Sequence, residues 1–335
     1  MFIKDSTDNP GDSIMLLLWV DDILGWSTND KLINELETAV SEKYGDSRLS
    51  KASTLQYIGM TITQPNRRGV VYVNQQEYTR KIVTASGVTG TSPSPNHAKL
   101  FRADDSRKGV PVDKTTFASH LMMAMYLAKR TRPDTLTALS ILATRVQTPD
   151  HIDRQCLDQV FKYINGTSEL GLTFKPTTME LHYWVDASYG VHADRRAHSG
   201  MMATLGYANA PMYVKSCKQK LHTRSSTEAE LVALDDCFLH LLWLRQIIEF
   251  MGYPQNPAFV YQDNKSTIFV CETGHSKNGR LKHMAVRYFF IHGQIELNIA
   301  KIKYCRTADM VADILTKPLM GSQFQVLRNK LLNVS

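Results

Sequence analysis

The chain has 335 residues, of which 43% are hydrophobic and 21% are charged, and its formal net charge is +7. This composition excludes wholesale disorder and supplies enough apolar residues for globular cores, while the length suits two domains better than one. The mild positive charge fits a nucleic-acid partner but does not require one.

Cysteine spacing and hydropathy exclude several further classes of protein. No two of the five cysteines stand at C-x-x-C spacing, so neither a zinc site nor a disulfide framework is expected. Reduced thiols indicate a cytoplasmic or nuclear setting. The polar N-terminus has no signal-peptide core, and the run "IMLLLWV" is too short to cross a bilayer. No membrane partner is therefore predicted.

The first segment, residues 14–28, reads as strand, tight turn and strand, with Asp21 and Asp22 in the turn between two apolar runs. A helix follows over 29–45, where Asn29 or Asp30 provides the N-terminal cap and a glycine ends it. Buried carboxylates are costly unless they are paired or bind a metal, so the two adjacent aspartates need a chemical reason.

The next segments predict a mostly helical region. "TLQYIGMTITQ" and "GVVYVNQQ" alternate as two strands of a hairpin around "PNRRG", and "QEYTRKIVTASG" is a short helix. Residues 88–113 form a long polar connection. Three helices are expected at 115–130, 134–147 and 151–166, each separated from the next by a proline-containing break. A polar hinge at 174–180 then suggests a domain boundary, with domains at 1–174 and 175–335.

The second half alternates between strands and helices. Three strands are followed by a long amphipathic helix, a strand, further helices, a strand and a last helix over "ADMVADILTK". Ser225 and Glu228 have capping-box spacing at the start of the long helix. This order predicts a mixed β-sheet flanked by helices.

Four acids occupy particular places on these elements. Asp186 ends the first strand, Glu230 lies near the start of the long helix, Asp263 ends the fourth strand, and Asp313 lies inside the last helix. Carboxylates that converge need a compensating cation, and Mg²⁺ favours such hard oxygen ligands, with Mn²⁺ as a possible substitute. Each acid also has an ordinary alternative: a turn, a helix-dipole contact, a loop cap, or for Asp313 an ion pair with Lys317.

Several multi-residue motifs resemble one known family. "VDASYG", "DRRAHSG", "KSCKQKLHTRSSTEAELVAL", "QDNKSTI", "KHMAVRYFFI" and "ADILTKPL" occur in the order found in copia-type LTR retrotransposon Pol polyproteins, in their ribonuclease H part. The chain departs from the family pattern after Asp186, where Ala187, Ser188 and Tyr189 replace a more common acidic and tryptophan-containing sequence.

This resemblance implies a ribonuclease H-like fold with a five-stranded mixed sheet. It also implies an Asp–Glu–Asp–Asp metal site that hydrolyses the RNA strand of RNA–DNA hybrids with two Mg²⁺ ions. Residue by residue, the catalytic and metal-binding set is Asp186, Glu230, Asp263 and Asp313; Glu230 is chosen because Glu228 serves the capping box. The nucleic-acid contacts expected from it are Lys218, Lys220, Arg224 and Asn264, although the three cations equally fit a solvated surface.

The first half resembles the end of a reverse transcriptase. "WVDDIL" matches the palm hairpin of that family, with Trp19 where tyrosine is usual, and "LQYIGMTI", "YLAKRTRPD" and "FKYINGT" match the segments that follow. Asp21 and Asp22 are then vestigial polymerase metal ligands, because the palm also needs an earlier aspartate and a fingers region. The chain is expected not to polymerise DNA alone.

Two alternatives stay open at this point. The chain could be a relic that binds nucleic acid without cutting it, or a fragment that works with other Pol polyprotein segments.

Overall fold

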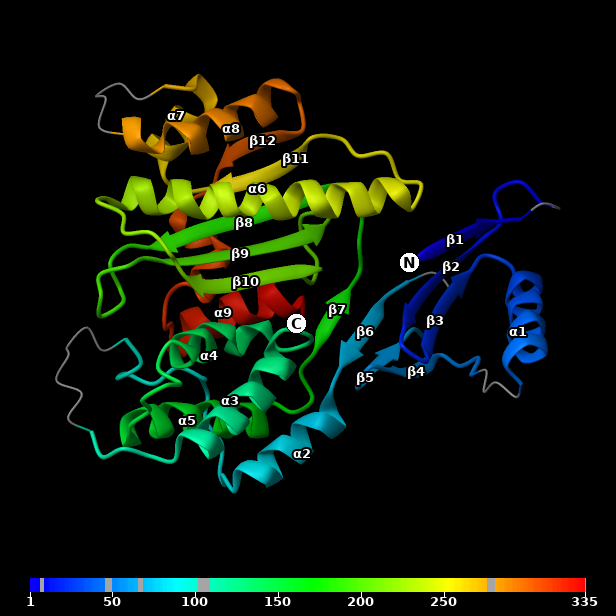
Figure 1. The fold of residues 1–335 in the computed structure, drawn as a ribbon, viewed down its shortest axis with the longest axis horizontal. Coiled ribbons are helices and arrows are strands. Elements are labelled where there is room, and N and C mark those ends of the chain that lie inside the picture. Colours follow the sequence, from blue (N-terminus) through cyan, green and yellow to red (C-terminus); the bar gives the residue numbers. More distant parts are fainter. Residues whose placement is uncertain (7–8, 46–49, 66–68, 102–108, 276–280, 335) are drawn as a thin grey trace. The chain divides into compact units, whose positions relative to one another are not determined.

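The chain forms two compact units in the computed structural model, Met1–Tyr72 and Val73–Ser335 (Figure 1). The structure describes residues 1–6, 9–45, 50–65, 69–101, 109–275 and 281–334. The boundary expected at 174/175 falls within the second unit, and as a division between domains it stays a prediction.

The first unit contains a three-stranded antiparallel sheet and a helix. The sheet has the order β1–β2–β3, and α1 begins where the side chain of Asn29 accepts a hydrogen bond from the backbone N–H of Lys31. The expected strand, turn and strand are therefore present, but the turn lies at Val20 and Asp21, because Asp22 already pairs with Trp19. The elements are β1 (Phe2–Asp5), β2 (Ser13–Trp19), β3 (Asp22–Ser27) and α1 (Asp30–Tyr44).

A second hairpin in this unit differs from the expectation. "TLQYIGMTITQ" is not one strand but two, β4 (Thr54–Tyr57) and β5 (Met60–Thr63). Its tight turn has Ile58 and Gly59 at φ 48° and 69°, the left-handed conformation that two-residue hairpin turns require. Strand β6 (Val71–Asn74) spans the division between the units, and residues 66–68 of the expected turn lie outside the described residues.

The second unit begins with the helices expected from the sequence. A fully buried ion pair closes the turn before η1: Arg132 binds both carboxylate oxygens of Asp134, at 3.0 and 2.8 Å, and also the carbonyl oxygen of Thr167. The elements are α2 (Gln76–Ser86), α3 (Lys114–Ala128), η1 (Pro133–Thr135), α4 (Leu136–Ala143), α5 (His151–Gly166) and β7 (Leu172–Phe174).

A mixed five-stranded sheet forms the centre of this unit (Figure 1). Its order is β10–β9–β8–β11–β12; the first three strands are antiparallel, and β11 is parallel to both β8 and β12. This topology confirms the expected α/β class and the ribonuclease H-like sheet. The strands are β8 (Leu181–Ser188), β9 (His198–Leu205), β10 (Tyr213–Lys218), β11 (Ala258–Gln262) and β12 (Ala300–Tyr304).

Helices cover both faces of the sheet. The long helix α6 (Ser226–Phe250) runs along one face, where it packs on Tyr183 and Val185 in a single apolar core (Figure 1). Trp184 and Met202 point to the other face and join the core built with α3, α4 and α5. The remaining elements between β11 and β12 are α7 (Lys265–Thr273), η2 (Lys282–Met284) and α8 (Ala285–Glu296).

The C-terminal segment corrects one expectation. Residues "ADMVADILTK" do not form an α-helix; they form two short 3₁₀ turns, η3 (Thr307–Asp309) and η4 (Val311–Leu315), and the last helix is α9 (Gly321–Leu332). This segment packs closely on β9, since a Cβ at Gly200 would lie 2.8 Å from Leu315 Cβ.

Two hydrogen bonds hold this segment against the early part of the unit. The Thr137 hydroxyl donates to the Ile314 carbonyl oxygen at 2.6 Å, and the Asn96 side-chain amide donates to the Leu319 carbonyl oxygen at 2.8 Å. Residues distant in sequence therefore share one core with the sheet. Within the described ranges, no helix combines the length and hydropathy that a membrane crossing needs.

Candidate active site

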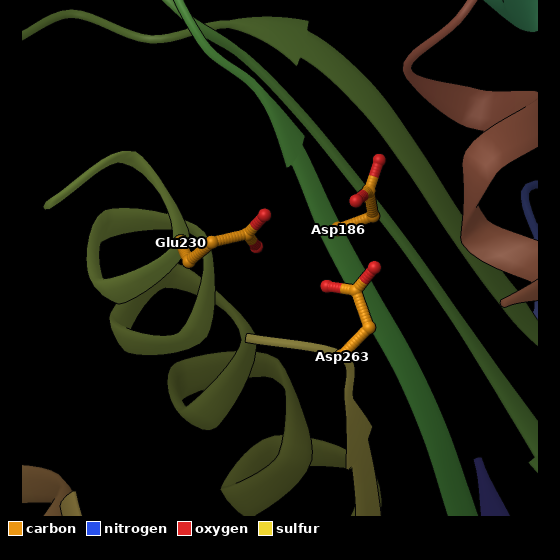
Figure 2. A group of neighbouring side chains, drawn as sticks. All are labelled: Asp186, Glu230 and Asp263. Carbon is orange, nitrogen blue, oxygen red and sulfur yellow. The ribbon is translucent and has the colours of Figure 1, made fainter. Parts of the chain in front are cut away.

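Three elements bring three carboxylates together at the carboxyl ends of β8 and β11, in the middle of the central sheet. Asp186 lies on β8, Glu230 near the start of α6, and Asp263 directly after β11, and their side chains point toward one another (Figure 2). One oxygen from each lies within 4.8 Å of the others. Because β8 and β11 are parallel neighbours, their carboxyl ends place Asp186 and Asp263 side by side.

The start of α6 determines which glutamate faces the sheet. The Ser225 hydroxyl caps the helix by accepting from the Glu228 N–H at 3.2 Å. The Glu228 carboxylate accepts from the Arg224 N–H at 2.8 Å, one residue before the partner that a capping box would use. Glu228 therefore stabilises the helix start, and Glu230 is left to join the two aspartates.

Hydrogen bonds fix all three carboxylates, and their donors were not expected from the sequence. Gln262 donates to Glu230 at 3.2 Å, and the Thr307 hydroxyl donates to Asp263 at 2.9 Å. The Thr316 hydroxyl donates to Asp186. Gln262 is fully buried at the end of an apolar strand, and a polar residue at such a position is the signal that could have identified it.

The fourth expected acid, Asp313, lies in η4 and is buried beside Lys317 rather than within the group of three. The Lys317 ammonium is 2.7 Å from Asp313 Oδ1 and 3.6 Å from Asp186 Oδ2. The ordinary alternative for Asp313, an ion pair with Lys317, is thus the contact observed. Lys317 links the fourth carboxylate to the first.

Burial makes ionisation of this cluster costly. Burial raises the pKa of Glu230 well above its usual range, and the neighbouring Asp186 and Asp263 carboxylates raise it further. Burial also raises the pKa of Asp186, against the opposing effects of Lys317 and Thr316. The pKa of Asp313 rises to about 6 through burial and the charge of Asp186. Lys317 therefore offsets only part of the negative charge that the ionised carboxylates would carry.

The donor set fits a divalent cation. Three carboxylate oxygens are hard ligands of the kind that Mg²⁺ and Mn²⁺ bind, and a cation would offset the repulsion that adds to the effect of burial on these pKa values. Asp186, Glu230 and Asp263 are the side chains that could hold it. They form the one group of three potential metal-ligating side chains found within the described ranges.

The other residues expected at the site lie outside the group of three carboxylates. Lys218 forms an ion pair with Asp194 at 2.6 Å, while Lys220 and Arg224 are exposed. The side chain of Asn264 caps α7 by accepting from the Thr267 N–H at 3.1 Å. In the first unit, Asp21 and Asp22 are exposed at the β2–β3 hairpin.

Sequence comparisons give a consistent set of relatives. The chain is 28% identical over 324 residues to the Retrovirus-related Pol polyprotein from transposon RE2 of Arabidopsis thaliana, covering 95% of this chain and 22% of that protein. It is 25% identical to the polyprotein from transposon TNT 1-94 of Nicotiana tabacum, covering 94% and 24%. The chain is related to copia-type retrotransposon Pol polyproteins. A Ty1 Gag-Pol polyprotein of Saccharomyces cerevisiae is 23% identical over 95% of the chain.

The chain spans about a fifth to a quarter of the length of the two plant polyproteins. No family model matches it.

Two solved structures match part of the chain at low similarity. LC11-RNase H1, isolated from compost, has 15% identity and a TM-score of 0.32, and covers 42% of this chain and 94% of that one. The N-terminal RNase H domain of rv2228c from Mycobacterium tuberculosis has 17% identity and a TM-score of 0.30, and covers 44% and 99%. The fold assignment itself rests on the strand order of the central sheet.

Proposed function

We propose that residues 175–335, which lie within the second unit, form a ribonuclease H-type nuclease that hydrolyses the RNA strand of RNA–DNA hybrids with a divalent metal, Mg²⁺ or Mn²⁺. The observation that carries this proposal is a group of three buried or half-buried carboxylates at the carboxyl ends of two inner strands of a ribonuclease H-like sheet. These are Asp186, Glu230 and Asp263. The relationship to Pol polyproteins supports the choice of nucleic acid as substrate.

The residues of the site have distinct tasks in this proposal. Bound metal would activate a water molecule and stabilise the leaving oxygen of the phosphodiester. Gln262, Thr307 and Thr316 hold the carboxylates in orientation through their hydrogen bonds. Asp313 completes the expected set of four acids by holding Lys317 beside Asp186.

The segment before α6 supplies candidate contacts to the nucleic acid. Lys220 and Arg224 are exposed there. Thr223 between them is 8% exposed, and its hydroxyl oxygen is buried without a hydrogen-bond partner among the described residues. A hybrid would be recognised by its shape and its 2′-OH groups rather than by base sequence.

The test is cleavage of an end-labelled RNA–DNA hybrid at millimolar Mg²⁺. Asp263→Asn removes one of the three ligand charges and should abolish cleavage while the circular dichroism spectrum is unchanged. Asp309→Asn is the matched control, because Asp309 is half exposed and lies outside the three-acid group. An uncut hybrid with the wild-type protein would refute the nuclease; binding without cleavage would instead favour a non-catalytic nucleic-acid-binding relic.

We also propose that the β2–β3 hairpin does not polymerise DNA in this chain. Among the described residues, Asp21 and Asp22 belong to no group of three metal-ligating side chains, which polymerase chemistry at two metals would need. Appreciable primer extension on an RNA template would contradict this. Since the relatives are longer, other Pol polyprotein segments are proposed partners, and residues 1–174 and 175–335 are proposed as the reverse-transcriptase-derived and ribonuclease H parts.

A further inference from the structure

A groove of about 620 Å³ lies beside strand β10, away from the three carboxylates. Helices α3 and α4 line it together with β10, and His240 of α6 contributes to it. Its lining includes four cationic side chains, and none of the described residues that line it is acidic. These cations are Lys129, Arg130, Lys215 and Lys218.

The cations of the groove are available to an anionic partner. Within the described part of the chain, Lys129 and Arg130 form no ion pair; Lys129 is exposed, and the Arg130 guanidinium lies over the Tyr126 ring at 4.0 Å. Lys215 and Lys218 pair with acids outside the lining, at 3.3 and 2.6 Å. Such partly exposed pairs contribute little free energy, so a phosphate can replace the carboxylate at small cost.

Strand register connects this groove to the acid cluster. Ser216 pairs with Gly200, and Gly200 pairs with Asp186. Two strand spacings therefore separate Ser216 from Asp186, a backbone distance of about 10 Å. Lys218 lies two residues further along β10, at the same end of the sheet as the acids.

Exposed cations continue from the groove toward the cluster. Lys220 and Arg224 follow Lys218 in the segment that leads into α6, which carries Glu230. A row of cations that leads to the proposed cleavage site can contact successive phosphates of a nucleic-acid backbone. An acidic peptide on the free edge of β10 would account for the groove but not for the cations beyond it.

We propose that the groove between β10 and helices α3 and α4 binds the backbone of an RNA–DNA hybrid, away from the bond that is cut. This inference rests on the proposed function. Its contacts supply affinity and orientation through phosphate charge, and they read no base sequence.

The experiment measures binding of a fluorescent RNA–DNA hybrid by anisotropy, in EDTA and over a range of KCl concentrations. The double variant Lys129→Glu/Arg130→Glu is compared with Lys301→Glu/Lys303→Glu, which changes the charge equally on β12, the opposite edge of the sheet. The groove variant should bind at least about tenfold more weakly. The slope of log K against log[KCl] should fall by about two, since each lost phosphate contact removes roughly 0.9.

Equal affinity and equal slope for the two double variants would overturn the groove proposal. If the glutamate variant does not fold, Lys129→Gln/Arg130→Gln should still lower the slope by about two. Cleavage by the wild-type protein is measured separately. If the wild type cuts the hybrid and the groove variant binds it like the control, only the groove proposal is refuted. If the wild type neither binds nor cuts the hybrid, the proposed function is refuted.

Discussion

The carboxyl group of Asp313 offers a direct test of the site's electrostatics. In the folded chain its pKa is raised from 3.8 to about 6, mainly by burial and then by the charge of Asp186. The folded state therefore holds this proton more tightly than the unfolded state does. Stability increases as the pH falls through about 6, and this gain is complete only below 3.8.

The size of the effect follows from the two pKa values. Keeping Asp313 ionised above pH 6 costs the folded, metal-free protein at most about 3 kcal/mol, and less to the extent that solvent and Lys317 screen the charge. Asp313→Asn is neutral at every pH and lacks this cost. In EDTA at pH 8 the variant should be more stable than the wild type, and the difference should shrink by about 1 kcal/mol at pH 5.

Urea unfolding followed by circular dichroism at several pH values measures this difference. Asp309→Asn serves as the control, because Asp309 is half exposed in the same C-terminal segment. Parallel stability curves for wild type and Asp313→Asn across pH 5–8 would refute the reasoning, since they would mean that Asp313 titrates alike in both states.

Three further substitutions test the packing and the charges of the second unit. Arg132→Met leaves the carboxylate of Asp134 buried without its partner, and the free energy of unfolding in urea should fall by about 3–5 kcal/mol. Gly200→Ala places a methyl group 2.6 Å from the segment after η4, so thermal unfolding should show a loss of about 1–3 kcal/mol, whereas Gly293→Ala, with nothing within 4 Å, should show none. Lys317→Met removes the cation that competes with metal, so calorimetric titration should show Mg²⁺ binding roughly two- to fivefold tighter; unchanged or weaker binding would contradict this.

Local rules predicted the elements and the positions of the main acids. Asn29 and Ser225 cap the helices that their spacing indicated, since a cap depends only on neighbouring residues. Asp186 and Asp263 could be placed near the ends of the first and fourth strands of this half, whereas the parallel pairing of those two strands is known only from the structure.

Contacts between distant residues could not be predicted in this way. Lys317 reaches Asp186 from the segment after η4, which packs closely on Gly200. This segment forms short turns where the sequence pattern predicted an α-helix. The two-residue turn at Ile58 and Gly59 could not be recognised in the sequence. Such turns are usually marked by asparagine followed by glycine, and here an isoleucine adopts the left-handed conformation.

The hydrogen bonds from Thr137 to Ile314 and from Asn96 to Leu319 have a consequence for folding kinetics. They join residues 177 and 223 positions apart, so Thr137 and Asn96 gain these partners only after Ile314 and Leu319 have been synthesised. Contacts between residues so far apart in sequence slow folding, and the incompletely folded chain exposes apolar surface until they form. The second unit should therefore complete its fold only after the segment that carries Ile314 and Leu319 has left the ribosome, when the helices and the sheet can share one core.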